Sequence, residues 1–277
     1  MKPGIYPRLA FEEYRLIHPR PWSPSSVIPG LVSMKELNYR RTHPVESTPA
    51  MKLGVAIHCA ILEPDQFPLR YCVWTGGRRF GHLYDAFCDA NEGKTSLTED
   101  QYQTCLDARD SAYAHPLAGP LLAASGMREV SILWVDRHSG LLCVGRIDLL
   151  LDGSFTIIDL KTTTDKVADD YAIRRSASKF RTDVSMAAYM DGISTLTGAI
   201  PDCKLLFVEQ KPPHDVRVMP MEHSLVQGYD DWQRVLGQIV ECNRTGIWSG
   251  CSDTEDELKV WETGTEYGNV MIGDEPI

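Results

Sequence analysis

A strand-forming stretch at residues 140–164 carries charged residues whose types and spacing indicate chemistry. The stretch reads GLLCVGRIDLLLDGSFTIIDLKTTT, and three of its charged residues stand out: Asp148, Asp159 and Lys161. A buried strand carries a charge only with compensation, because removing a charge from water is costly. We therefore take these three residues as the candidate centre of the protein's function.

The residues around Asp152 and Gly153 predict a β-hairpin. Segments 141–151 and 155–161 are rich in strand-forming residues. Asp-Gly between two such segments is typical of a tight two-residue turn, because both residues tolerate a positive φ. The stretch is therefore expected to fold as two antiparallel strands.

The hairpin would bring the charges together. Side chains alternate between faces along a strand, so Asp159 and Lys161 share one face. With a two-residue turn, Asp148 lies opposite Ile157 and diagonal to Asp159, about 7–8 Å away at the backbone. Two carboxylates at that separation can bind one cation between them. A one-residue change in the loop would turn Asp148 to the other face.

Two converging carboxylates favour hard cations that bind oxygen, such as Mg²⁺ or Mn²⁺. A neighbouring lysine can position a water molecule or stabilise charge on a phosphoryl oxygen. The alternative is a structural ion pair in which Lys161 neutralises one aspartate, although such pairs are often replaceable by apolar residues. Two acids and one base leave one charge unpaired, and this favours the metal site.

Composition limits the class of protein. The chain has 277 residues, 43% of them hydrophobic, enough for one large core or a core with an appended lobe. It contains no run of about 18 apolar residues, which predicts no membrane span, and its start lacks the apolar core of a signal peptide. Eight cysteines without a CxxC motif give little support to zinc or iron–sulfur ligation. We expect reduced thiols in a cytoplasmic protein.

The acidic charge is concentrated at the C-terminus. Of the net charge of −10, residues 249–277 carry −7 and the other 248 residues carry −3. A nearly neutral body can still present a basic channel to DNA. We expect one domain over 1–248, with a helical part over about 1–125 and a core that holds the candidate centre over about 126–248. The acidic tail, 249–277, is expected to be disordered.

Several motifs resemble known nucleases. Asp148 followed by Asp159-Leu160-Lys161 fits the PD-(D/E)xK nuclease superfamily. Within that superfamily, the RecE-type exonuclease (exonuclease VIII) family is similar to four segments: PGIY, LGVAIHCAILEPDQF, GLLCVGRID and IIDLKTTTD. The resemblance covers most of the chain up to about residue 220. It implies an α/β fold with a restriction-endonuclease-like mixed sheet flanked by helices, and an N-terminal helical portion.

The resemblance also implies roles for individual residues. Lys161 would orient the attacking water and stabilise the phosphoryl charge, and Glu129 would join the metal or water network. The residues implied to hold Mg²⁺, with Mn²⁺ as a substitute, are His58, Asp148, Asp159 and the carbonyl of Leu160. From the residues alone, His58 can equally be a core histidine on an apolar helix, and Glu129 an edge-strand charge.

Other residues are candidates for binding DNA. Paired arginines suit phosphates, but a charged run can also be a solvated face. The family carries a Gln-x-x-x-Tyr pattern in the helix expected over 183–197. Tyr189 matches its tyrosine or is a core residue, and the shorter Ser185 takes the place of the glutamine. The DNA-binding candidates are Arg78, Arg79, Arg146, Arg174, Arg175, Ser185 and Tyr189.

The remaining elements follow from periodicity and capping signals. We expect helices over 23–39, 51–63, 98–113, 116–124, 183–197 and 224–244. Further strands are expected over 129–136, 203–209 and 215–221, and residues 65–97 are expected to be irregular.

The leading hypothesis is a metal-dependent, sequence-independent exonuclease acting on the ends of linear double-stranded DNA. The resemblance implies 5′-to-3′ digestion, a ring-shaped homo-oligomer, a single-strand annealing protein as partner and a role in phage-type recombination. One alternative is a nuclease acting on single strands, flaps or RNA. Another is a catalytically weakened nuclease fold that only binds DNA.

Overall fold

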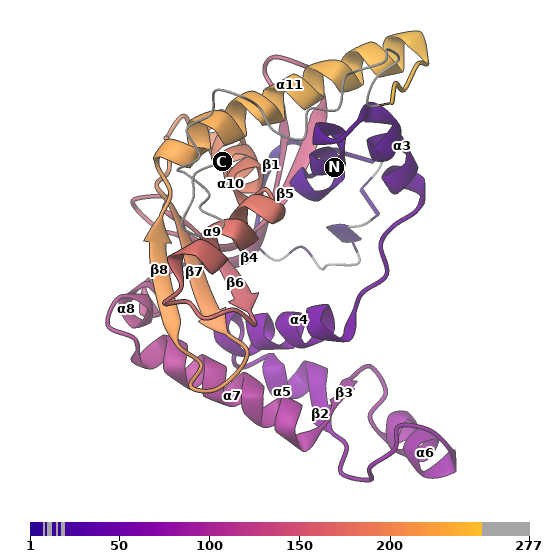
Figure 1. The fold of residues 1–277 in the computed structure, drawn as a ribbon, viewed down its shortest axis with the longest axis vertical. Helices are drawn as coiled ribbons and strands as arrows, with labels where there is room; N and C mark the ends of the chain where they lie inside the picture. The colour runs from indigo at the N-terminus through magenta and orange to yellow at the C-terminus, as the bar shows by residue number, and fades with distance from the viewer. Residues whose placement is uncertain (8, 10–12, 15, 18–19, 251–277) are drawn as a thin grey trace, which may run out of the picture.

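A six-stranded mixed sheet forms the centre of the protein (Figure 1). The computed structural model describes residues 1–250 except 8, 10–12, 15 and 18–19, so nearly all of the expected acidic tail lies outside it. All neighbouring strands are antiparallel except β6 and β7, which are parallel. In spatial order the strands are β1 (Gly4–Tyr6), β4 (Gly126–Val135), β5 (Leu142–Leu151), β6 (Ile157–Thr163), β7 (Cys203–Glu209) and β8 (Val216–Pro220).

Helices cover both faces of the sheet, which confirms the expected fold class. Ile157 of β6 packs into the core on one face, while Ile158 and Leu160 pack into the core on the other. Because both faces are buried, the central strands are almost continuously apolar. One face is covered by α2 (Pro24–Val27), α10 (Thr182–Thr197) and α11 (His223–Thr245); the other by α4 (Pro49–Leu62), α7 (Glu99–Ala114) and α8 (Ala118–Ala123).

Most expected helices and strands are present within a few residues of their predicted bounds. The prediction of a single helix over residues 23–39 was wrong. The chain forms α2, a 3₁₀ turn η1 (Ile28–Leu31) and α3 (Met34–Thr42) instead. Pro29 has no N–H to donate, and the Ser33 hydroxyl caps a new helix by accepting a hydrogen bond from the backbone N–H of Glu36 (3.1 Å).

Residues 65–97 are more ordered than expected. They form α5 (Phe67–Arg70), β2 (Tyr71–Val73), α6 (His82–Ala90) and β3 (Thr95–Leu97), with β2 and β3 paired in a separate sheet. This small lobe lies on the far side of α4 from the main sheet (Figure 1). Strand β1 and helix α9 (Asp170–Lys179) were also missed by the sequence patterns.

The turn between β5 and β6 is longer than expected, and this changes the register. The N–H of Leu151 donates to the carbonyl of Thr156 (2.9 Å), so four residues, 152–155, form the loop. The β5–β6 ladder pairs Leu150 with Ile157 and Leu149 with Ile158, and the next position of this register places Asp148 opposite Asp159. The expected two-residue turn was therefore wrong. Because the shift is by two residues, Asp148 keeps its face.

None of the helices in the described part of the chain is both long and apolar enough to span a membrane. The seven cysteines among the described residues are free thiols, and Cys251 lies outside that part.

Hydrogen bonds to the Asp136 side chain connect the loop after β4 to α11. Its side chain, only 1% exposed, accepts hydrogen bonds from the backbone N–H groups of His138 and Ser139, the Ser139 hydroxyl and the Gln233 amide. Burial by itself would raise the pKa of Asp136, but the hydrogen bonds from Ser139, Gln233 and His138 outweigh it and lower the pKa below its ordinary value of 3.8.

We expect Asp136→Asn to lower the free energy of unfolding by about 1.5–3 kcal/mol near neutral pH, the range for hydrogen bonds to a charged group. A lowered folded-state pKa stabilises the protein above the unfolded-state pKa, and this contribution disappears as the pH falls through the folded-state value. Urea unfolding at pH 7 and at pH 3 measures both effects, and the gap from wild type should narrow at pH 3. Asp110→Asn, an exposed carboxylate paired with Arg109, is the control and should change little. An equal gap at both pH values would contradict the assignment.

Candidate metal centre and active site

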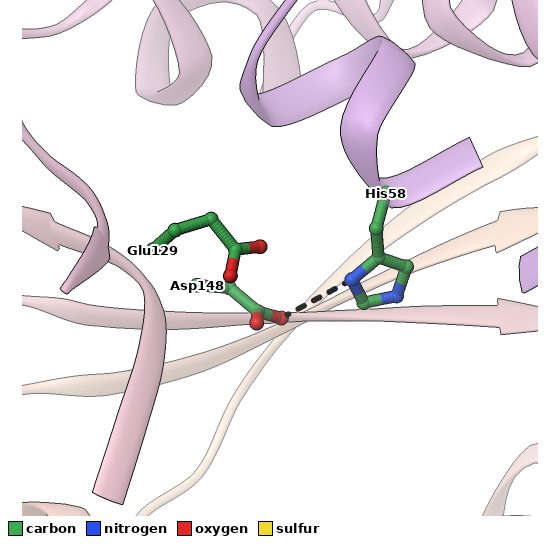
Figure 2. Close-up of side chains that lie close together, drawn as sticks. All are labelled: His58, Glu129 and Asp148. Carbon is green, nitrogen blue, oxygen red and sulfur yellow. Dashed lines mark ion pairs between the residues drawn. The ribbon is translucent and has the colours of Figure 1, made fainter. Parts of the chain in front are cut away.

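Three side chains from different elements converge beside the β5–β6 hairpin. His58 comes from α4, Glu129 from β4 and Asp148 from β5, and Figure 2 shows the His58 ring reaching from its helix toward the two carboxyl groups. One potential ligand atom from each of the three lies within 4.8 Å of the others. Nδ1 of His58 is 3.8 Å from Oδ2 of Asp148, too far for a hydrogen bond.

A distortion of β4 helps to place Glu129 opposite Asp148. Glu129 has a φ of 49°, a left-handed conformation that costs a non-glycine residue about 1–3 kcal/mol and is often found at functional sites. The alternation of side-chain directions along β5 is interrupted at the same level. Ile147 and Leu149 are two residues apart and would share a face of a regular strand, but they pack into the cores on opposite faces. The flanking pairs of the ladder are Arg128–Leu149 and Val130–Ile147.

Two contacts hold the carboxylates in place. The Leu160 N–H donates to Oδ2 of Asp148 (2.7 Å), so the Asp148 side chain satisfies a backbone group of β6. Nε of Arg146 donates to Oε2 of Glu129 (2.7 Å), and Nη1 of Arg146 donates to the carbonyl of Leu9 (3.2 Å). The carboxyl groups are therefore oriented before any ligand binds.

Asp159 and Lys161 form a separate ion pair within the same site. Nζ of Lys161 is 2.6 Å from Oδ2 of Asp159, and the side chains are 36% and 7% exposed respectively. Lys161 therefore neutralises Asp159, as the structural alternative proposed. Asp148 is left with His58 and Glu129, so the pairing leaves negative charge for a cation to compensate.

Burial and mutual repulsion shift the pKa values of the clustered groups. Burial, then Asp159 and Glu129, raise the pKa of Asp148 well above its ordinary value. Burial also raises the pKa of Glu129, although Arg146 opposes it. Burial and then Lys161 lower the pKa of His58 to about 4, so its ring is neutral near pH 7. Burial lowers the pKa of Lys161, but Asp159 and Asp148 outweigh it and the net shift is upward.

These residues fit a divalent cation. A neutral imidazole and two carboxylates converge on one point, and the two carboxylates are ionised only at an electrostatic cost that a cation would relieve. A ligand set of mainly oxygen atoms suits Mg²⁺ or Mn²⁺. The carbonyl of Leu160 remains a predicted ligand, as does Asp159.

Tyr189 lies close to this cluster. Its ring packs on Gly145, where an added Cβ would come within 2.8 Å of the ring. Burial, then Asp159 and Asp148, raise the pKa of Tyr189 well above its ordinary value, so the phenol stays protonated. Ser185 lies one turn earlier on α10. A DNA contact by Ser185 or Tyr189 remains a prediction.

The arginines predicted to bind DNA fall in different parts of the fold. The loop carrying Arg78 and Arg79 joins β2 to α6, in the lobe away from the catalytic strands (Figure 1). Arg79 donates to the side-chain oxygen of Gln101 (2.9 Å). Arg174 and Arg175 lie on α9, and Arg175 lines a cavity that also reaches His58.

That cavity, of about 710 Å³, lies between α4 and the end of α9, and we call it the α4–α9 cavity. Sequence patterns missed two of its residues. Gln210 follows β7 and donates from Nε2 to Oγ1 of Thr162 on β6 (3.1 Å), beside Gly54 of α4. Gln210 lies outside the motifs of the sequence, and Thr162 lies within the IIDLKTTTD segment but was not predicted to be a site residue. Only the pairing of β6 with β7 brings them together.

A family model and one solved structure agree with this architecture. The family model described as "PDDEXK-like domain of unknown function (DUF3799)" matches residues 32–259. No curated protein matches the chain. A crystal structure of a presumed exonuclease from Eubacterium rectale is similar, with a TM-score of 0.57, 13% identity and coverage of 92% of this chain and 96% of the other. A phage-related exonuclease from Haemophilus somnus 129PT gives a TM-score of 0.36 at 13% identity, covering 84% and 98% of the two chains.

Gly54 allows α4 to approach β6 closely, because a Cβ there would lie 2.8 Å from Oγ1 of Thr162. Gly237 on α11 has no atom within 4 Å of an added Cβ, so Gly237→Ala should raise the free energy of unfolding by about 1 kcal/mol through helix propensity. We expect Gly54→Ala to lack this gain, since the new methyl group pushes the helix that carries His58 away from the strand. Urea unfolding of both variants measures the difference, and equal stabilisation would contradict the close approach.

We expect Mn²⁺ to raise the melting temperature of the wild-type protein, because a ligand at 100 times its dissociation constant stabilises the fold by about 2.7 kcal/mol. Asp148→Asn and His58→Ala should lose this response. Asp170→Asn removes an exposed carboxylate paired with Arg217 and should keep it. Thermal unfolding with Mn²⁺ and with EDTA measures the effect. An unchanged metal response in both site variants would exclude this cluster as the metal centre.

Proposed function

Because the chain belongs to the PDDEXK-like family DUF3799, we propose that it is a metal-dependent exonuclease that degrades linear double-stranded DNA from an end. One observation carries the proposal: His58, Glu129 and Asp148 converge beside the Asp159–Lys161 ion pair. Superfamily membership supports nuclease chemistry. The exonuclease assignment draws on the RecE-type resemblance and on the similar fold of the presumed exonuclease from Eubacterium rectale.

In this proposal Asp148, Asp159 and the carbonyl of Leu160 hold Mg²⁺, with His58 and Glu129 completing or supporting the site. The bound cation supplies Lewis-acid stabilisation of the charge that develops on the phosphate during hydrolysis. Mn²⁺ is expected to substitute, because it accepts similar oxygen ligands.

Lys161 is the residue proposed to orient the attacking water and to stabilise the phosphoryl charge. Its ammonium is held by Asp159 at 2.6 Å, and its raised pKa keeps it protonated near neutral pH. A protonated lysine donates hydrogen bonds and cannot accept a proton. This supports a positioning and charge-stabilising role for Lys161 over a role as general base.

The wider organisation is also a proposal. Residues 1–248 form one nuclease domain with a separate acidic tail, and the chain assembles into a ring that degrades DNA 5′-to-3′ and works with a single-strand annealing protein in phage-type recombination. The RecE-type resemblance supports these points. No base-reading motif was found in the sequence, which favours hydrolysis without sequence preference. Arg146, Arg174, Arg175, Arg78 and Arg79 are proposed phosphate contacts, with Ser185 and Tyr189 nearer the cut.

We expect the protein to degrade linear 5′-phosphorylated duplex DNA with Mg²⁺ and to leave a closed circle intact. Lys161→Ala should lower kcat by about 100- to 1,000-fold, the usual effect of removing one charge-stabilising donor. Release of acid-soluble nucleotides from labelled DNA, with Mg²⁺ and with EDTA, measures the activity.

Lys94→Ala is the matched control, because Lys94 lies in the small lobe, where its Nζ donates to the carbonyl of Pro68 (3.0 Å). It should leave hydrolysis unchanged. Cutting of the circle would overturn the exonuclease assignment but keep the nuclease. Hydrolysis of neither substrate with Mg²⁺ or Mn²⁺, while single strands or flaps are cut, would change the substrate class. If none of these substrates is hydrolysed, the remaining hypothesis is a nuclease fold that only binds DNA.

A further inference from the structure

An exposed aromatic side chain lies in the same cavity as His58. Phe180 follows the last residue of α9 and lines the α4–α9 cavity. Its side chain is 63% exposed. One exposed apolar residue needs no special explanation by itself, so the argument depends on what holds Phe180 in place and on what surrounds it.

The backbone around Phe180 is fixed by part-buried ion pairs of Arg181. Arg181 has a φ of 47° and forms the kink between α9 and α10. Its Nη2 is 2.7 Å from Oδ2 of Asp183 and 2.5 Å from Oδ2 of Asp231 on α11. The backbone N–H of Phe180 donates to the carbonyl of Ser176 (3.1 Å). These contacts hold the Phe180 backbone at a defined position above the cavity.

Basic groups accompany the ring. Lys179 Nζ lies 5.5 Å from the centre of the Phe180 ring, within the range of a cation–π contact. Arg175, one turn earlier on α9, lines the same cavity. The acidic Asp165 also lines the cavity, but its single negative charge is smaller than the two positive charges of Lys179 and Arg175. An aromatic face beside cationic groups is the combination that binds single-stranded nucleic acid. The nucleobases stack on the aromatic rings, and the phosphates contact the lysine and arginine side chains.

We propose that Phe180 is a stacking platform for one unpaired base of the substrate strand, with Lys179 and Arg175 contacting its phosphates. Away from the ends of duplex DNA both faces of a base are covered by its neighbours, so an internal base can stack on Phe180 only after it leaves the duplex. His58, one residue of the candidate metal centre, lines the same cavity, so the platform lies on the His58 side of that centre. The cavity volume of about 710 Å³ falls within the range of about 300–1,000 Å³ for small-ligand sites. The inference rests on the proposed nuclease function and adds a subsite to it.

The test is fluorescence anisotropy in EDTA, which prevents hydrolysis, with three probes: a labelled oligothymidine strand, the same strand with abasic positions, and a blunt duplex. Phe180→Ala should weaken binding of oligothymidine by about 5- to 100-fold. It should change binding of the abasic strand and the blunt duplex by less than about twofold. Phe180→Trp should restore binding, because its ring also offers a stacking face.

Two controls separate stacking from general effects. Tyr39 is also an exposed aromatic residue, at 53%, but lies on α3 and does not line the α4–α9 cavity, so Tyr39→Ala should bind all three probes like wild type. Lys179→Ala and Arg175→Ala should weaken binding of all three probes and reduce its salt dependence.

The inference is overturned if wild type does not bind oligothymidine, if Phe180→Ala weakens all three probes equally, or if Phe180→Trp fails to rescue. The nuclease proposal fails separately. If wild type binds oligothymidine through Phe180 but hydrolyses no substrate with Mg²⁺ or Mn²⁺, the stacking proposal is supported and the nuclease proposal is contradicted. If Phe180→Ala binds oligothymidine as wild type does and still degrades linear DNA, the nuclease proposal is supported and the stacking proposal is contradicted.

Discussion

Electrostatic repulsion among three enclosed acids is the constraint on which the site depends. Asp148, Asp159 and Glu129 approach one another where burial already disfavours a charge, and such clusters are stable only with compensation. Lys161 neutralises Asp159, and Arg146 pairs with Glu129. Among the described residues, Asp148 accepts a hydrogen bond from the backbone N–H of Leu160 and faces a neutral imidazole. The unbalanced charge on Asp148 is what makes a cation site physically reasonable.

The backbone is distorted where it holds these acids. The left-handed conformation of Glu129 and the interrupted alternation of β5 occur at the same level of the sheet. An ideal ladder would direct alternate side chains strictly to opposite faces. The distortion instead lets side chains of β4 and β5 meet His58 of α4. A local cost in backbone energy at a functional site is a common pattern, and packing of the surrounding sheet supports it.

Close packing of helices on the sheet shapes the approach to the site. Gly54 brings α4 against Thr162 of β6, and the Arg181 kink directs the end of α9 toward the same cavity. Both features act over long sequence separations: Arg181 is held by Asp231, 50 residues away, and α4 meets a strand about 100 residues later. The cavity is therefore a product of tertiary packing on both sides of the sheet.

The sequence alone determined the hairpin and its three candidate site residues, because strand propensity and the Asp-Gly turn signal are local properties. The α/β class with a mixed sheet came from the resemblance of its motifs to known nucleases. The resemblance of its motifs pointed to His58 and Glu129 before any geometry was known. Only the tertiary structure decided that Asp148 faces Asp159, since the register depends on a turn that proved two residues longer than expected. Tertiary packing alone also decided which acid Lys161 neutralises, and it brought Gln210 and Phe180 to the cavity of His58. These contacts depend on strand pairing and helix packing between distant segments, which no local pattern encodes.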